Sequence, residues 1–242
     1  MQTFKSYTIE SSILKEGLED ATAFKAIMMA GGAGSGKSFV IKKTGLRGFG
    51  MKVSNSDPTF ERMLKGAGLK KNSEDIMSAQ GQAIRGTAKE LTDKQKEQWL
   101  KGRLGIIVDG TGKDLQDVKQ EVKKMRDIGY DVAMIFVNTE LEVSIERDNN
   151  RQRTLGAKLV TKTWNAVQKN RNDFKRMFGS QFVEINNGAR TGMPDITSDL
   201  NKAMQKLSGW INRAPSSTQY KNWVKAEMKK KGLKTWRKPS VR

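Results

Sequence analysis

The chain of 242 residues contains no cysteine and no histidine. Disulfides, thiolate nucleophiles, zinc sites built from cysteine and histidine, and imidazole acid–base catalysis are therefore excluded from this chain. Any proton transfer that it catalyses has to use a carboxylate, a lysine or a tyrosine. With no cysteine to indicate an oxidising compartment, we expect a cytoplasmic protein.

Long hydrophobic runs are missing as well. No run of 18 apolar residues occurs, and residues 1–17 mix charged and scattered apolar side chains instead of forming the apolar core of a secretory signal. We therefore expect no membrane span. The length fits one large α/β domain or two small ones, with enough chain to bury a core.

Negative charge is scarce relative to positive charge. Lysine and arginine number 45 against 26 aspartate and glutamate residues, which gives a net charge of +19. Such an excess favours a polyanionic partner such as nucleic acid, a phosphorylated ligand or an anionic membrane surface. The sign of the charge restricts the partners and leaves the reaction open.

Short apolar runs alternate with helical patterns along the chain. The apolar runs are mostly continuous, which is typical of strands buried on both faces; they are 26–30, 51–53, 104–108, 132–137 and 182–185. Helical patterns lie between them at 39–44, 73–100, 115–128, 141–150 and 163–177, and a further helix near Pro194 runs to about residue 212. This alternation predicts an α/β fold, in which a parallel sheet carries helices on both faces.

A glycine-rich loop follows the first apolar run and leads into a helical segment. Residues 31–38 satisfy the pattern G-x-x-x-x-G-K-[ST], the signature of a phosphate-binding loop. Glycines allow backbone N–H groups to converge on phosphate oxygens, the lysine reaches the β- and γ-phosphates, and the serine hydroxyl is a ligand for Mg²⁺. We therefore expect a magnesium–nucleoside triphosphate here, bound by Gly31, Gly32, Ala33, Gly34, Ser35, Gly36, Lys37, Ser38 and Phe39.

Asp109 ends the third apolar run, where a carboxylate faces the crevice at the carboxyl ends of parallel strands. A Mg–phosphate site in this fold needs such a group, so we expect Asp109 and Ser38 to hold the metal. The alternative is that Asp109 caps the following helix, because Asp-Gly-Thr-Gly is also a turn sequence. The next residue is glycine rather than the glutamate that polarises water in many motor ATPases, which favours transfer over hydrolysis.

Asp57 follows the second apolar run and precedes a helix that contains Arg62. A carboxylate there can accept the proton of an attacking hydroxyl during phosphoryl transfer. An aspartate followed by Pro58, with Glu61 further on, is equally typical of a helix N-cap. The sequence leaves the two roles open at this position.

Three arginines, Arg147, Arg151 and Arg153, lie at the end of the helix predicted at 141–150. Guanidinium groups on a connecting segment can close over a triphosphate and neutralise the charge that develops during transfer. The alternative is a solvated basic face. Only the phosphate loop favours the catalytic interpretation.

The order of these motifs resembles the P-loop kinases of the 5′-polynucleotide kinase and zeta-toxin group. The resemblance covers residues 24–187, from the glycine-rich loop through Asn55-x-Asp57 and the run ending in Asp109 to the arginines. It implies a five-stranded parallel sheet, a Mg–ATP donor and a hydroxyl acceptor. Carried over by position, it implies donor phosphate and metal binding by Lys37 and Ser38, a general base at Asp57, an active-site carboxylate at Asp109, a lid arginine at Arg151, and helper roles for Arg147 and Arg153.

Two departures bear on the acceptor. In polynucleotide kinases an arginine typically stands three residues after the base and contacts the acceptor phosphate, whereas this chain has Phe60 there and Arg62 two residues further on. The polar helical stretch 66–102 has no assigned role. We expect residues 1–213 to form a kinase domain with an N-terminal extension.

Residues 214–242 form a basic tail outside the resemblance. Nine basic residues against one glutamate give +8 in 29 positions, and Tyr220 and Trp223 stand at helical spacing between lysines. The pattern predicts a basic amphipathic helix followed by a frayed end. The aromatic rings either stack on nucleic-acid bases or dock the tail onto the core or a protein partner.

The favoured function is an ATP-dependent kinase whose acceptor is a 5′-OH polynucleotide, which the charge of +19 favours. The alternative within enzymes is a zeta-toxin-like kinase of a small molecule such as a UDP-sugar. From a different class, the chain would be a nucleotide-binding structural or packaging protein that binds nucleic acid through its tail.

Overall fold

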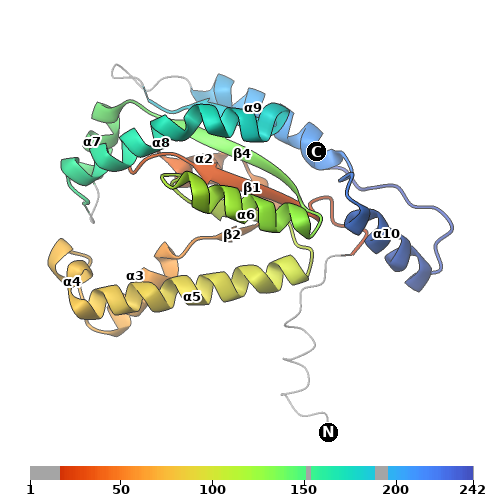
Figure 1. The fold of residues 1–242 in the computed structure, drawn as a ribbon, viewed down its shortest axis with the longest axis horizontal. Helices are drawn as coiled ribbons and strands as arrows, with labels where there is room; N and C mark the ends of the chain where they lie inside the picture. The colour runs from red at the N-terminus through yellow and green to blue at the C-terminus, as the bar shows by residue number, and fades with distance from the viewer. Residues whose placement is uncertain (1–16, 151–153, 189–195, 242) are drawn as a thin grey trace, which may run out of the picture.

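The computed structural model of the protein describes residues 17–150, 154–188 and 196–241. Five strands form one sheet in the order β2-β3-β1-β4-β5, and every neighbouring pair is parallel (Figure 1). The strands are β1 (Lys25–Ala30), β2 (Lys52–Ser54), β3 (Ile106–Asp109), β4 (Asp131–Asn138) and β5 (Phe182–Asn186). Each coincides within two residues with a predicted apolar run, which confirms the five-stranded parallel sheet.

The apolar runs are continuous because both faces of the sheet are covered. In β1, Ile27 and Met29 lie in one hydrophobic cluster, while Ala26 and Met28 lie in the cluster on the opposite face. All six residues of this strand are buried. Alternate side chains of a strand point to opposite faces, so burial on both sides removes the usual alternation of polar and apolar residues.

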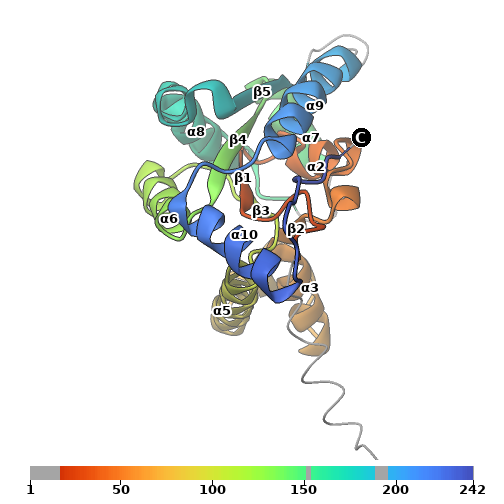
Figure 2. The same ribbon diagram turned by 90° about the vertical axis from the view of Figure 1, so that its right-hand side faces the viewer.

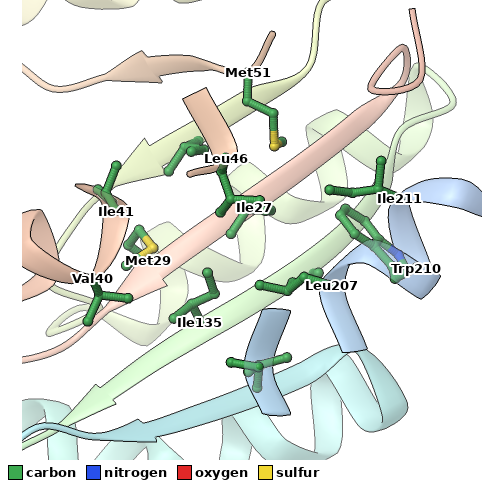
Figure 3. Packing of buried hydrophobic residues seen from close by; sticks show 14 of the residues in the cluster. Ile27, Met29, Val40, Ile41, Leu46, Met51, Ile135, Leu207, Trp210 and Ile211 are labelled. Atoms are coloured by element: carbon green, nitrogen blue, oxygen red, sulfur yellow. The ribbon is translucent and has the colours of Figure 1, made fainter. Parts of the chain in front are cut away.

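Two helices cover each face of the sheet (Figure 2). The first face carries α2 (Lys37–Lys43) and α9 (Ile196–Asn212), and Figure 3 shows their side chains meeting those of β1 and β4. The other face carries α6 (Leu115–Asp127) and α8 (Ala157–Phe178). The remaining short elements are α7 (Leu141–Asn149), η1 (Leu46–Phe49) and η2 (Gly179–Gln181).

Three helices form a separate arm beyond the β2 edge of the sheet (Figure 1). They are α3 (Asp57–Gly66), α4 (Ser73–Met77) and α5 (Ala79–Lys101), and their own cluster contains Phe60, Leu64 and Ala88. The prediction of one helix over 73–100 was wrong, because Ser78 has extended dihedral angles and interrupts it. Its hydroxyl accepts a hydrogen bond from the Gly81 N–H, so this serine ends α4 and caps α5.

One helix start also differs from the prediction. The helix predicted to begin at Thr163 begins at Ala157, because the turn from Gly156 leads directly into it. Pro194 lies outside the described residues, and α9 ends at Asn212 as predicted. The ends of helices depend on tertiary contacts that periodicity does not record.

The basic tail forms α10 (Thr218–Lys230) and then runs back along the core (Figure 2). The predicted frayed end was wrong for residues 231–241. Trp236 donates its indole N–H to the Leu18 carbonyl at 3.2 Å, and the Val241 N–H donates to the Asn212 side chain at 2.7 Å. These hydrogen bonds hold a segment that has no regular secondary structure.

Candidate active site

The predicted site residues come from the carboxyl ends of three adjacent strands. Met29 of β1 pairs with Asp109 of β3, so the loop after β1 and the end of β3 lie side by side, and β2 leads to Asn55 and Asp57 on the far side of β3. These side chains line one pocket of about 330 Å³, which we call the hollow. Its lining residues are Ala33, Gly34, Gly36, Lys37, Ser38, Asn55, Asp57, Arg85, Asp109, Gly110, Thr111, Lys113, Leu155, Leu159 and Thr163.

The glycines of the phosphate loop are required by the backbone path. Gly34 and Gly36 have φ angles of +77° and +87°, in the left-handed region that side chains disfavour. A Cβ atom on Gly34 would lie 2.3 Å from the Ser144 carbonyl oxygen, and one on Gly36 would lie 2.1 Å from the Asn187 amide nitrogen. The loop therefore takes this shape only with glycine at both positions.

Lys37 folds back over the loop. Its ammonium donates to the Gly31 carbonyl at 2.8 Å and the Gly32 carbonyl at 3.2 Å. The same ammonium acts on Asp109, where it opposes a rise in pKa. The lysine thus holds a positive charge between the glycine-rich loop and the carboxylate of β3.

Asp109 is oriented by Asn55, whose side-chain amide donates to the Asp109 carboxylate at 2.7 Å. Burial raises the pKa of Asp109 and the nearby Asp57 carboxylate raises it further, while Lys37 and the Asn55 hydrogen bond oppose the rise. The alternative that Asp109 caps a helix was wrong. The N-cap of α6 is Asp114, whose side chain accepts from the backbone N–H groups of residues 116 and 117.

Asp57 is the first residue of α3, and the N-cap is Ser56. The alternative that Asp57 is the N-cap was therefore wrong by one position. Its backbone N–H donates to the Asn55 side-chain oxygen at 2.8 Å. Asn55 thus contacts both acidic residues, through its amide to Asp109 and through its oxygen to the backbone of Asp57.

A second set of hydrogen bonds joins the phosphate loop to the segments that follow β4 and β5. The Ser35 carbonyl accepts a hydrogen bond from the Asn187 side chain at 2.7 Å and from the Thr139 hydroxyl at 3.1 Å. Trp164 donates its indole N–H to the Thr139 carbonyl at 2.7 Å. These residues follow β4 and β5 or lie on α8, and the sequence analysis missed them because no local motif marks a hydrogen bond across 152 positions.

Of the three predicted arginines, Arg147 is the one that lies within the described residues. Arg147 lies on α7 and donates to the Asn187 carbonyl at 2.8 Å, beside the phosphate loop. Arg151 and Arg153 lie outside the described residues. The neighbouring Asp148 is fully buried and accepts from the backbone N–H groups of Leu155 and Gly156 at 2.8 and 3.0 Å. This carboxylate fixes the chain just after the arginine-bearing segment.

Arg85 is the main lining residue that the sequence analysis missed. It comes from α5, and its guanidinium lies 4.3 Å from the centre of the Phe60 ring. Phe60 itself is 1% exposed and belongs to the core of the helical arm. The arm, which had no assigned role, therefore brings a cation to the hollow, supported on the ring that replaces the expected arginine.

A model of the zeta toxin family matches residues 13–187, which is more than half of the chain. The chain belongs to the zeta toxin family. Zeta toxins are P-loop kinases, and the phosphate loop of this member is intact, so it is an ATP-dependent kinase. A comparison with curated protein sequences found no match.

Solved structures agree in fold with this zeta toxin family member. The AvrRxo1-ORF1:AvrRxo1-ORF2 complex has a TM-score of 0.56 at 13% identity, covering 97% of this chain and 84% of that chain. A structure of the same pair with ATP has a TM-score of 0.55 at 13% identity, covering 93% and 82%. The PezAT toxin–antitoxin system of Streptococcus pneumoniae has a TM-score of 0.53 at 11% identity, covering 96% and 98%.

The residues at the hollow fit a magnesium ion that is bound together with a nucleotide. Within the described ranges no group of three or more acidic residues could hold a metal by itself. Ser38 and Asp109 nevertheless face the same space, and Mg²⁺ usually takes one or two protein oxygens together with phosphate oxygens and water. A nucleotide-dependent magnesium site therefore agrees with the donor set.

Two further expectations concern the surface. The Phe39 ring is 42% exposed, and the Lys43 ammonium lies 5.7 Å from its centre, so its part in nucleotide binding stays a prediction. In the part of the chain that the structure describes, no helix is both long and apolar enough to cross a membrane.

Proposed function

We propose that this zeta toxin family member transfers the γ-phosphate of Mg–ATP to a hydroxyl group of a small acceptor that carries phosphate. The observation that supports this proposal is the meeting of Lys37, Asp57 and Asp109 at one hollow. In the reaction, the acceptor oxygen bonds to the γ-phosphorus and the bond from that phosphorus to the ADP oxygen breaks. The hydroxyl proton passes to Asp57, and ADP leaves.

The chain's own residues divide this work. Lys37 exchanges its carbonyl partners for the β- and γ-phosphate oxygens and neutralises charge on them. Ser38 and Asp109 would hold Mg²⁺, which supplies further positive charge to the same phosphates. Asn55 keeps Asp109 and the start of α3 in register, so that the base and the metal-binding carboxylate stay on the same side of the acceptor.

The arginines complete the donor side of the proposal. Arg147 holds the Asn187 carbonyl next to the phosphate loop, close to the position of the triphosphate. We assign to Arg151 the role of the lid arginine and to Arg153 a helper role. Asp148 of α7 holds Leu155 and Gly156 at the start of α8.

The choice of a small acceptor depends on where the positive charge lies. Of the net +19, the tail contributes +8, and α10 packs at the opposite edge of the sheet from the phosphate loop. On the acceptor side, Arg85 supplies a cation from α5 for an acceptor phosphate group. A nucleotide sugar fits these requirements. A 5′-OH polynucleotide is the second candidate, because residues 1–213 still carry +11 of the total of +19.

The acceptor is identified by incubating the protein with labelled ATP and, separately, UDP-sugars, nucleosides, 5′-OH DNA and 5′-OH RNA. We expect label in a UDP-sugar, and none with an Asp57→Asn protein prepared in the same way, which controls for contaminating kinases. Label only in the 5′-OH polynucleotides would contradict the small acceptor. If no acceptor is labelled and none stimulates ADP release, both proposed acceptor classes are contradicted.

We also infer a protein partner. The PezAT structure is described as a toxin–antitoxin system and the AvrRxo1 structures as complexes, which supports a partner for this chain as well. Analytical ultracentrifugation of the protein mixed with each candidate partner protein tests this, and separate sedimentation from all of them would contradict it.

A further inference from the structure

The basic tail packs against the end of the sheet at which β1 and β4 begin, which we call the amino edge; the opposite end, where the strands finish, is the carboxyl edge. Ser217, the N-cap of α10, donates to the Gly129 carbonyl at 2.7 Å, just before β4 begins. Tyr220 is 4% exposed, and its ring meets Phe24, just before β1, edge-on at 5.5 Å. Trp223 contacts the same ring at 5.4 Å. Both aromatic side chains of α10 are therefore used to attach the tail to the core.

The segment after α10, residues 231–241, crosses the same edge; we call it the strap. Lys238 donates to the Ala21 carbonyl and to the Ile211 carbonyl. Lys231 forms an ion pair with Glu19 at 2.6 Å. Together with the Trp236 and Val241 hydrogen bonds, these contacts hold the strap against residues 18–21 and the end of α9.

Attachment of the apolar side leaves a row of lysines facing outward. Lys221, Lys225 and Lys229 are exposed and stand four residues apart, which places them about 6 Å from one another along one side of α10. Among the described residues no carboxylate lies within ion-pair distance of these three side chains, whereas Lys230 is paired with Glu227. Exposed Lys234 and Arg237 of the strap extend the positive surface.

We propose that this outer face of α10 and the strap binds the sugar-phosphate backbone of duplex nucleic acid without sequence preference. The regular lysine row matches a repeating line of phosphates, and contacts to phosphate carry affinity without reading bases. Tyr220 and Trp223 are packed against Phe24, so they are not available to stack on unpaired bases.

A membrane surface fits the same charge less well. An interfacial helix inserts an apolar face among the lipids while its basic face contacts the headgroups. In α10 that apolar face is packed on the core, and Leu233 of the strap is the one large hydrophobic side chain of the described tail that is exposed. Nucleic acid requires only the lysines, which are the groups that α10 presents.

Binding at this surface is separate from phosphoryl transfer. The tail packs where β1 begins, and the phosphate loop starts where β1 ends, six residues later. At about 3.3 Å per residue the two lie on the order of 20 Å apart. Nucleic acid bound here anchors the enzyme and is not its acceptor.

The test compares two full-length variants with the same change in charge. The tail variant is Lys221→Gln/Lys225→Gln/Lys229→Gln. The control variant is Lys65→Gln/Lys94→Gln/Lys202→Gln, which removes three exposed lysines from α3, α5 and α9. Fluorescence anisotropy with a labelled, 5′-phosphorylated DNA duplex is recorded over a series of salt concentrations, and circular dichroism checks that both variants fold.

We expect the tail variant to bind at least roughly tenfold more weakly near 0.1 M salt, with the log–log salt slope smaller by about 2.7, because each phosphate contact contributes about 0.9. The control should keep the wild-type slope. Equal losses in both variants would show that only net charge matters and overturn the proposal. A clear preference for single strands, or binding by the tail lysines to anionic phosphatidylserine vesicles but not to DNA, would also overturn it.

Kinase activity serves as an independent readout. The tail variant should phosphorylate its acceptor at the wild-type rate, because none of the three lysines reaches the hollow. A kinase-inactive protein that still binds duplex DNA through the tail would contradict the proposed function alone. An active kinase whose tail variant binds DNA normally would contradict the tail proposal alone.

Discussion

At each end of the parallel strands a lysine lies next to an aspartate, and the two lysines differ in their surroundings. At the carboxyl edge, Lys37 lines the hollow and donates hydrogen bonds to two backbone carbonyl groups of the phosphate loop. At the amino edge, Lys25 is fully buried, ion-paired with Asp131 at 2.8 Å and hydrogen-bonded to the Trp210 carbonyl at 2.8 Å. The first lysine can exchange its partners for a ligand, whereas the second is committed to the fold.

The same contrast applies to the aromatic and basic residues around each pair. At the amino edge, Trp210 lies under the Lys25 ammonium at 4.4 Å, and the strap closes over the region. At the carboxyl edge, Arg85 lies over a buried ring but lines the hollow. We interpret a cation that is buried on every side as part of the fold. We interpret a cation that faces a cavity as one that binds a ligand. The edges should therefore respond differently to substitution.

The largest effect on activity is expected for Lys37→Ala. Loss of the ammonium removes the charge that stabilises the transferred phosphate, so the rate of transfer should fall by roughly a hundred- to a thousandfold. Single-turnover transfer with labelled ATP measures the rate, and thermal unfolding should show an unchanged midpoint. A strongly lowered midpoint would mean that Lys37 is structural as well.

Lys25→Ala should give the opposite pattern. It leaves Asp131 without its cation and the Trp210 carbonyl without its donor, and it opens a cavity next to Trp210. We expect a loss of about 3 kcal/mol in the free energy of unfolding, measured by urea denaturation. The folded fraction should transfer phosphate at the normal rate, and reduced activity per folded molecule would contradict the assignment of Lys25 to the fold.

Arg85→Gln should act on the acceptor alone. Removing a charge-assisted contact to phosphate costs about 1.5–3 kcal/mol, which corresponds to a roughly ten- to hundredfold higher KM for the acceptor. The KM for ATP should stay unchanged. Lys94→Gln, an exposed position on the same helix, is the control and should change neither constant. Equal effects on both substrates would place Arg85 in general folding rather than acceptor binding.

A pH dependence is expected at the amino edge. Burial and, to a lesser extent, the nearby Lys25 charge lower the pKa of Lys238 from 10.5 to about 8, against the opposing effect of Asp20. Between these two values the unfolded chain binds more protons than the folded chain, so stability should rise with pH over that window. Urea denaturation should show a steeper rise in the wild type than in Lys238→Gln, which keeps only the contribution of other groups such as Lys25, whose pKa is also lowered by burial. A constant difference between the two proteins across the window would refute the shift.

The sequence predicted most of the sheet and the donor side of the site because both are recorded locally. Continuous apolar runs marked all five strands, and the phosphate loop follows β1 with its glycines at the positions that need a left-handed backbone. The positions of Asp57 and Asp109 at the hollow were predictable because Asp109 ends β3 and Asp57 lies three residues after the end of β2. The order of parallel strands then brings these positions to one edge.

The remaining features depend on contacts between residues far apart in sequence. Asn187 reaches Ser35 and Arg85 reaches Phe60 through packing of separate elements, which periodicity does not encode. Ser78 interrupts the helix predicted at 73–100 because a serine that fits a helix pattern is also a strong N-cap. The strap has no periodic pattern, and its position depends on hydrogen bonds, an ion pair and packing of Trp236 and Val241 against the core.

The central claim is that Asp57, at the carboxyl edge, acts as the general base in phosphoryl transfer. The most direct test measures single-turnover transfer and equilibrium ATP binding for Asp57→Asn, with the exposed α6 residue in Asp117→Asn as the matched control. We predict that transfer falls by about 10²–10⁴-fold in Asp57→Asn while ATP binding is unchanged, and that the control behaves as wild type. Wild-type transfer by Asp57→Asn, or a loss of ATP binding as large as the loss of transfer, would contradict this account.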